Sequence, residues 1–358
     1  MSSRAIVVGA GVIGRMIGLS LARVGWQVRL VDRGDREGTR TCTWAALGMI
    51  SPYCAIGQDP VVTRLGQFGL EAWPDWLEGL SAPVFHGDLG MLALAHPRDR
   101  SDLVTLHRQA VAGGAGLEVV EPLDGAGIAD LEPELADRFR EGLFFPHEQH
   151  LDNRALLSAL AGSLEEEGVE CHWSTEVSGL EPGRVVLRDG MFEGDWVVDT
   201  RGLGARTDLP NLRGVRGERL VLHAPGVGLS RPVRVMHPRF NLFLVPRPGR
   251  RILVGATSVE SESEDPVGQP VIDELLAAAA WVHPGLRRAT LLEACVHHRP
   301  ALPEPCPRIF PEPGLIRING LNRFGLLVSP ALAAIAVDFM TEGSHHDLAE
   351  GVMEEWSL

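Results

Sequence analysis

The chain has 358 residues, about two to three times the usual length of one domain, so we expect two domains or one large composite domain. Hydrophobic residues make up 45% and charged residues 22%, as in ordinary soluble globular proteins. Asp and Glu outnumber Lys and Arg by 47 to 33. This net charge of −14 argues against a surface that binds nucleic acid or an anionic membrane.

The cysteines and the N-terminus bear on the cellular compartment. The five cysteines form no CxxC pair and no zinc-site spacing, so we expect isolated thiols, no disulfide framework and no metal site. The N-terminus lacks the pattern of a signal peptide, and no window approaches the ~20 apolar residues of a membrane span. We therefore expect a soluble, cytoplasmic protein.

The first 32 residues follow the order strand, glycine-rich turn, helix, strand, acid. An apolar run at residues 5–8 precedes the turn, a helical pattern continues to residue 24, and a second apolar run at 28–31 ends in Asp32. The glycines of the turn are Gly9, Gly11 and Gly14. They suit a tight turn, close approach to a pyrophosphate and close helix–strand packing, while Asp32 can accept hydrogen bonds from a ribose. This order predicts a dinucleotide-binding unit, for FAD or NAD rather than NADP.

The rest of the chain alternates between two kinds of pattern. The further predicted helices lie at residues 64–80, 99–112, 153–167, 271–281 and 329–340, with one more at the C-terminus. The further predicted strands lie at residues 91–95, 169–173, 184–187, 196–199, 219–223, 242–246, 251–255, 291–298 and 315–319. Because α/β segments enclose a mostly β region, we expect two interleaved domains rather than one cut point.

Motifs along nearly the whole chain resemble one family. Besides residues 9–32, they lie at 45–49, 84–85, 90–91, 95–100, 199–206, 213–218, 237–239, 244–247, 254–257, 299–300 and 319–325. In this order they resemble the D-amino-acid-oxidase-like FAD flavoproteins, and most of all the proteobacterial glycine oxidases of thiamine biosynthesis. The resemblance implies an α/β composite fold, in which a Rossmann-type FAD-binding domain (residues 1–55, 145–215 and 300–358) is interleaved with an antiparallel-sheet substrate domain (56–144 and 216–299).

The family pattern also implies which residues contact FAD. They are Gly9, Gly11, Val12, Ile13, Gly14, Asp32, Arg33, Cys42, Thr43, Leu47, Gly48, Met49, Val177, Gly202, Leu321, Asn322, Arg323, Phe324, Gly325, Leu326 and Leu327. The last of these lead into a helix expected to begin at Ser329, whose positive N-terminal end would stabilise the reduced flavin.

The implied reaction is oxidation of a small amine or amino acid. A hydride passes from the α-carbon to flavin N5, the imine hydrolyses, and O2 reoxidises the flavin to give H2O2. The resemblance makes Arg299 the cation for the substrate carboxylate and Arg323 a second site arginine. The position of a family tyrosine that helps hold the carboxylate is taken by Phe243, which cannot donate a hydrogen bond, and Tyr53, the only tyrosine, cannot replace it. A second departure lies around Arg323, where the family pattern has aromatic Tyr and His and this sequence has Asn322 and Phe324. The two departures put free glycine in doubt as the substrate.

Two further side chains and two readings of the function stay open. Either His297 or His298, next to Arg299, could belong to the site. The partner is a small amine or amino acid, with no nucleic acid and no membrane. The alternative is a maturase that acts on a precursor protein during tryptophylquinone biogenesis, for which the lost tyrosine would leave a more open site. The oligomeric state is open, a homo-oligomer included.

Overall fold

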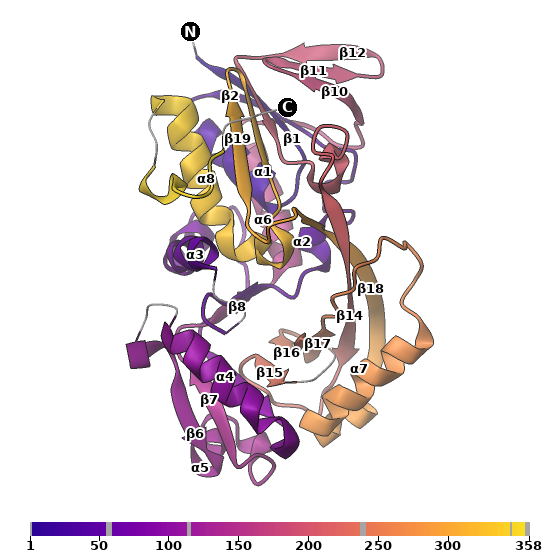
Figure 1. Ribbon diagram of the computed structural model, residues 1–358. Helices are drawn as coiled ribbons and strands as arrows, with labels where there is room; N and C mark the ends of the chain where they lie inside the picture. The colour runs from indigo at the N-terminus through magenta and orange to yellow at the C-terminus, as the bar shows by residue number, and fades with distance from the viewer. Residues whose placement is uncertain (1, 55–58, 113–115, 237–240, 344–345, 355–358) are drawn as a thin grey trace.

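The computed structural model describes residues 2–54, 59–112, 116–236, 241–343 and 346–354 (Figure 1). The family motif at residues 237–239 lies outside this part of the chain. Two large sheets organise the fold, one of six strands and one of eight, and each is accompanied by a small three-stranded sheet. The predicted α/β composite fold is confirmed.

The six-stranded sheet contains the N-terminal motif. Its strands, in order across the sheet, are β19 (Arg308–Glu312), β20 (Leu315–Asn319), β13 (Trp196–Asp199), β1 (Arg4–Val8), β2 (Gln27–Val31) and β9 (Glu170–His172). All neighbours are parallel except β19 and β20. Parallel strands buried on both faces require the continuous apolar runs that the sequence shows here.

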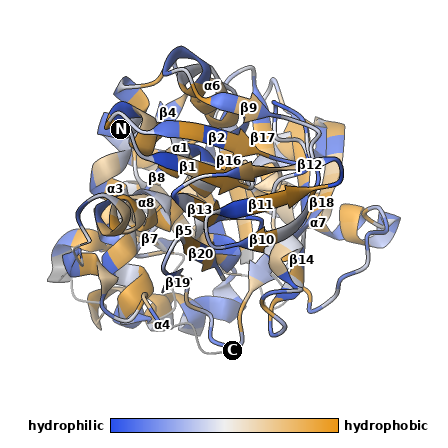
Figure 2. Ribbon diagram, turned by 90° about the horizontal axis from the view of Figure 1, so that it is seen from above, coloured by the Kyte–Doolittle hydropathy of each residue, from blue (hydrophilic) through white to orange (hydrophobic). Residues whose placement is uncertain are grey.

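Different layers cover the two faces of this sheet. On one face lie α1 (Val12–Arg23), α3 (Pro60–Glu78), α6 (Asn153–Glu166) and α8 (Gly325–Glu342). On the other face lies the sheet of β10 (Val177–Glu181), β11 (Arg184–Leu187) and β12 (Gly190–Glu193). Successive residues of β1 point to opposite faces, so Val7 packs under the helices and Ile6 under β11. Figure 2 shows the hydrophobic strands between these layers.

The eight-stranded sheet is mostly antiparallel. Its order is β18 (Thr290–Ala301), β14 (Arg213–His223), β17 (Arg251–Gly255), β16 (Asn241–Arg247), β15 (Val233–Met236), β5 (Met91–Ala95), β7 (Glu141–Phe145) and β6 (Glu121–Asp124). One pair, β15 with β5, is parallel. A small sheet consists of β3 (Met49–Ile50), β8 (Gln149–Leu151) and β4 (His86–Gly87). In the sequence, β4 directly precedes β5 and β8 directly follows β7.

Two helices lie on opposite faces of the eight-stranded sheet. Leu220 and Leu244 face the core that contains α7 (Gln269–Val282), whereas Val221 and Phe243 face the core that contains α4 (Arg100–Ala110). Figure 1 shows α7 and α4 at the two sides of the lower part of the molecule. Two short helices, α2 (Cys42–Ala45) and α5 (Gly125–Leu131), complete the fold. The period-2 alternation therefore places Phe243 on the α4 side of the sheet.

The predicted division into two interleaved domains stays a proposal. The six-stranded sheet collects strands from the first, middle and last thirds of the chain, as interleaving requires. However, α3, which the predicted boundaries assign to the substrate domain, shares a core with α1 and α8.

The start of α8 corrects one prediction. The helix begins at Gly325, after the 3-10 turn Asn322–Phe324, and not at Ser329. Pro330 resembles a first-turn proline in the sequence, but here it lies inside the helix. Its missing N–H would have bonded the Leu326 carbonyl, which instead accepts a hydrogen bond from the indole of Trp73 (2.9 Å). A buried side chain thus allows the helix to continue past the proline.

Two other predictions about the C-terminal region need correction. The segment Asn322–Glu342 is long and apolar enough to cross a membrane, so the prediction that no stretch of the sequence approaches a membrane span was wrong. Because 67% of it is buried against the rest of the protein, we interpret it as a core helix. The second C-terminal helix is, in the described residues, a short 3-10 turn at Asp347–Ala349.

Candidate functional site

The glycine-rich turn has room for a pyrophosphate above it. A Cβ on Gly11 would meet only the Thr43 hydroxyl, at 3.8 Å, whereas a Cβ on Gly14 would lie 1.9 Å from the Gly9 carbonyl oxygen. Gly9 has φ +104°, which L side chains rarely adopt. Gly11 precedes the first turn of α1, which has no side-chain cap. The first helical N–H groups and the open space at Gly11 therefore fit a bound diphosphate.

Asp32 closes this end of the site. Its two carboxylate oxygens accept hydrogen bonds from the N–H groups of Ala10 and Gly34, both at 2.6 Å. These bonds fix the carboxylate beside the glycine-rich turn, and each oxygen keeps a lone pair for a ribose hydroxyl. Val177, predicted to meet the adenine, packs against the hydrophobic cluster that contains Val8 and Val31, at the ends of β1 and β2.

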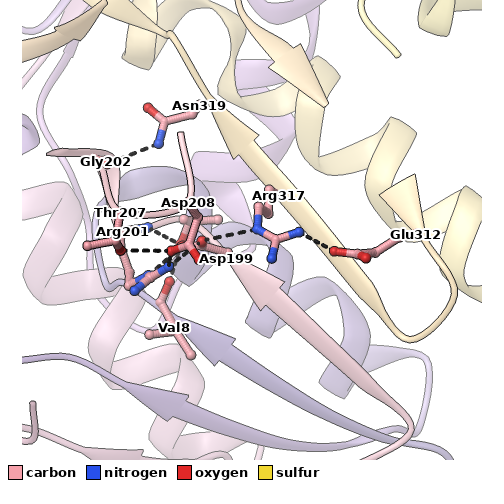
Figure 3. A network of polar contacts seen from close by, with 10 residues as sticks. Val8, Asp199, Arg201, Gly202, Thr207, Asp208, Glu312, Arg317 and Asn319 are labelled. Carbon is pink, nitrogen blue, oxygen red and sulfur yellow. Dashed lines mark hydrogen bonds and ion pairs between the residues drawn. The ribbon is translucent and has the colours of Figure 1, made fainter. Parts of the chain in front are cut away.

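A buried ionic network holds the turn after β13, next to the glycine motif (Figure 3). Arg201 binds Asp199 (2.8 Å) and Asp208 (2.6 Å), and Arg317 binds Asp199 (3.9 Å) and also pairs with Glu312. Because Asp199 is 1% exposed, removal of either arginine would leave a buried charge poorly compensated.

The same network fixes Gly202. Its carbonyl oxygen accepts a hydrogen bond from the Asn319 side chain (3.0 Å). Gly202, Leu321 and Arg33 do not line the large cavity described next, and their predicted contacts with FAD stay predictions.

A cavity with about 1170 Å³ of empty space, including its open mouth, lies between the two large sheets. It brings together residues from α2 and the following loop, β14, β16, β18 and the start of α8. The predicted site residues that line it are Cys42, Thr43, Leu47, Gly48, Met49, Phe243, His297, Arg299, Asn322, Arg323, Phe324, Gly325, Leu326 and Leu327. The Thr43 hydroxyl also accepts a hydrogen bond from the N–H of Val12 (3.1 Å), so this residue of the cavity wall contacts the first turn of α1.

The short helix α2 and the loop after it are held by buried side chains from three other elements. Their hydrogen bonds run from Asn153 Nδ2 to the carbonyl of Thr43 (2.6 Å), from Arg219 Nε to that of Ala45 (2.6 Å), and from Arg247 Nη2 to that of Leu47. Arg219 and Arg247 are 3% and 6% exposed. Burial lowers the pKa of Arg247 to about 10, but both arginines remain cations at neutral pH. The loop carbonyls are therefore turned into the protein.

The guanidinium of Arg299 fills the space where Gly217, on the neighbouring strand, has no side chain. It lies in β18, and a Cβ on Gly217 of β14 would be 2.3 Å from its Nη2 atom. In the described residues its guanidinium donates one hydrogen bond, to the Thr257 carbonyl (3.1 Å). Thr257 in turn donates its hydroxyl proton to Glu218 (2.9 Å). The guanidinium is thus positioned at the cavity wall with further N–H donors for a ligand.

Positive charge gathers around this part of the cavity. Burial lowers the pKa of Arg299, and the nearby Arg323 lowers it further. Burial and the charge of Arg234 lower the pKa of Arg323. Arg323 has an exposed side chain within the cavity, and its guanidinium lies 5.0 Å from the centre of the Phe324 ring. The field of these cations favours an anionic ligand such as a carboxylate.

Sequence reasoning missed several residues of the site. Glu218 and Thr257 line the cavity, as does Arg219, and they hold Arg299 or the loop after α2. Glu218 and Thr257 end two of the family motifs, at residues 213–218 and 254–257, and Arg219 begins the predicted strand at 219–223, but none of the three was assigned a role. Among the residues that the structure describes, no group of three or more His, Cys, Asp or Glu could hold a metal ion.

Comparison with known proteins gives the class of the protein, a flavin-dependent oxidoreductase. The family of FAD dependent oxidoreductases, DAO, matches residues 4–339, and the chain belongs to it. The predicted family, enzyme class and FAD cofactor are thereby confirmed.

Individual relatives narrow the comparison. The chain is 38% identical over 342 residues to a candidate thiamine biosynthesis oxidoreductase, ThiO, of Rhizobium etli, covering 95% of this chain and 97% of that protein. It is 28% identical to the glycine oxidase of Pseudomonas aeruginosa, with 95% of each chain covered. Among solved structures, it is similar to iminodiacetate oxidase from Chelativorans sp. BNC1 (TM-score 0.85, 25% identity, 98% and 99% covered). It also has the fold of glycine oxidase from Geobacillus kaustophilus (TM-score 0.86, 23% identity, 99% of each chain covered).

Proposed function

We propose that the protein oxidises a small amine that carries a carboxylate, with O2 as the electron acceptor. When bound, FAD would accept a hydride from the substrate α-carbon at N5 and return the electrons to O2, which gives H2O2. The imine product then hydrolyses in water. The observation that carries the proposal is Arg299 at the wall of a cavity that also contains Thr43, whose hydroxyl bonds the first turn of α1 after the glycine-rich turn. The names of relatives, glycine oxidase and iminodiacetate oxidase, support the substrate class.

The residues of the chain have distinct tasks in this proposal. Gly9 to Gly14 and Asp32 would hold the diphosphate and the ribose, and residues 43–49, in α2 and the loop after it, would hold the flavin. Arg299 binds the substrate carboxylate through a bidentate pair and thereby orients the α-carbon. Arg323 adds positive charge on the same side. No side chain needs to remove a proton from carbon if the amine binds in its neutral form.

Phe243 sets this cavity apart from a site built for free glycine. It lines the cavity, is 7% exposed, and pairs with Arg234 and Gly255 on the neighbouring strands. A hydroxyl donor at this place would contribute roughly 1–3 kcal/mol to carboxylate binding. We therefore propose that the substrate is a secondary or larger amine, whose additional contacts replace this hydrogen bond.

The test is reduction of the bound flavin, without oxygen, by a panel of glycine, sarcosine, iminodiacetate and D-amino acids. We expect one or more of them to bleach the flavin, and F243Y to lower the apparent Kd of glycine by about fivefold or more. F192Y, on β12 outside the cavity lining, is the control and should change nothing. If F243Y leaves the affinity for every carboxylate substrate unchanged, Phe243 does not face the substrate.

Phe243 also favours the second candidate function. A cavity without the hydroxyl donor suits a residue within a protein chain, which has no free α-carboxylate, as the substrate of a maturase for tryptophylquinone cofactors. Absence of bleaching by every free amine, together with co-purification of a precursor protein, would favour the maturase over the amine oxidase.

A further inference from the structure

The thiol of Cys42 and the imidazole of His297 lie against each other at the cavity wall. Cys42 begins α2 and His297 lies in β18, and the sulfur is 3.2 Å from Nδ1 of the ring. Both residues line the cavity together with Arg299. Hydride transfer from an amine gives neither side chain a chemical step, so the pair needs a separate explanation.

The surroundings of the ring select the nitrogen that faces the sulfur. Nε2 lies 3.1 Å from the Arg40 carbonyl oxygen and donates its proton there in the neutral ring. In that tautomer Nδ1 accepts the N–H of His298 (2.9 Å) and can accept the thiol proton. The carbonyl oxygen of His298 lies 2.9 Å from the sulfur, to which it is the second acceptor, and 3.2 Å from Nδ1. A nucleophile, a base within hydrogen-bond reach and a third group that orients the base is the arrangement that activates a thiol.

Charge supports the same reading. Burial lowers the pKa of His297, but its contacts with Cys42 and with the carbonyls of Arg40 and His298 outweigh this and raise the pKa to about 9, so the ring next to the thiol is a base that can hold a proton at neutral pH. Arg299 adds a second cation on the same side of the sulfur. The other four thiols, Cys54, Cys171, Cys295 and Cys306, line no part of the cavity, and burial raises the pKa of each of them.

We propose that Cys42 and His297 form an activated thiol–imidazole pair that hydrogen peroxide oxidises to a sulfenic acid. Nδ1 of His297 takes the thiol proton, and the sulfur attacks one oxygen of the peroxide. The S–O bond forms as the O–O bond breaks, so the sulfur is oxidised and the peroxide is reduced. The leaving hydroxide takes the proton from Nδ1 and departs as water. If the enzyme itself supplies the peroxide during turnover, that source rests on the proposed function. The reaction of Cys42 with added peroxide does not depend on it.

The test treats the FAD-loaded enzyme with added H2O2, traps sulfenic acid with dimedone and locates the label by mass spectrometry. No amine is present, so the outcome does not depend on the proposed oxidase activity. We expect Cys42 to be labelled at least about tenfold faster than Cys171 and Cys295, the two other half-buried thiols. Equal or slower labelling of Cys42 overturns the proposal.

Variants of His297 test whether Cys42 reacts because the imidazole acts as its base or only because the thiol is accessible. H297N and H297Q should slow labelling of Cys42 by about tenfold or more. The matched control is H298N, whose ring contacts the Ser263 carbonyl (2.9 Å) instead of the thiol and which should leave the rate unchanged. Thermal unfolding of each variant shows that it is folded. Unchanged labelling in a folded H297N or H297Q enzyme would show that the imidazole does not activate the thiol.

Discussion

The substitution G11A should weaken FAD binding without harming the protein fold. Gly11 has φ −69°, which alanine adopts readily, and the added Cβ would meet only the Thr43 hydroxyl at 3.8 Å. The apoprotein should therefore unfold at the same free energy as wild type or up to about 1 kcal/mol higher, because alanine restricts the unfolded chain. The Cβ would instead enter the space assigned to the diphosphate. Overpacking of this kind costs about 1–3 kcal/mol, which is about 5- to 150-fold in Kd.

The matched variant is G14A. Its Cβ would lie 1.9 Å from the Gly9 carbonyl oxygen and 2.5 Å from the Thr200 hydroxyl oxygen, so it should lose roughly 3 kcal/mol of stability even without FAD. The assays are denaturant unfolding of the apoprotein and titration with FAD, followed by flavin fluorescence. A folded G11A protein that binds FAD as tightly as wild type would refute the placement of the diphosphate over Gly11.

Three further predictions concern buried charges. R299K should raise the KM of a carboxylate substrate about tenfold or more in a steady-state peroxide assay, because lysine lacks the bidentate fork; an unchanged KM would exclude Arg299 as the carboxylate site. R219M should lower the free energy of unfolding by about 1–3 kcal/mol and weaken FAD binding, because it removes the side-chain hydrogen bond to the Ala45 carbonyl, whereas Asn153 still bonds the Trp44 carbonyl; a stable variant with normal FAD affinity would contradict this. Burial raises the pKa of Glu148 from 4.5 to about 7, although the N–H groups of Cys54 and Tyr53 act against this. Because the pKa of Glu148 is raised in the folded state, its contribution to stability is lost as pH rises from about 4.5 to 7. E148Q should therefore be more stable than wild type by up to about 3 kcal/mol at pH 8 but not at pH 4. Equal unfolding curves of the two proteins at pH 8 would contradict this prediction.

The parts of the fold that local sequence determines were predictable. The runs at residues 5–8 and 28–31 are β1 and β2, and the helical pattern between them is α1. In this segment apolar periodicity, glycine positions and the terminal acid all indicate the same structure, and few contacts from distant residues are needed to fix it.

The parts of the site that depend on distant contacts were not predictable. Arg219 contacts a carbonyl 174 residues away and Arg247 one 200 residues away, and no local pattern in the sequence announces such a bond. The Cys42–His297 contact spans 255 residues. The start of α8 was misplaced for the same reason, because the indole of Trp73, 253 residues from Leu326, binds the carbonyl that Pro330 leaves unpaired. Resemblance to a family supplied the positions of Arg299 and Phe243, which periodicity alone could not.

The most direct test of the central proposal is rapid mixing of the FAD-loaded enzyme with carboxylate-bearing amines in the absence of oxygen. If Arg299 binds the substrate carboxylate, at least one such amine should bleach the visible flavin absorbance in a saturable manner, and the apparent Kd should rise in R299K. Addition of O2 should then restore the absorbance with release of H2O2. Bleaching by an amine without a carboxylate, or bleaching whose concentration dependence is the same in R299K, would contradict the role of Arg299 as the carboxylate site.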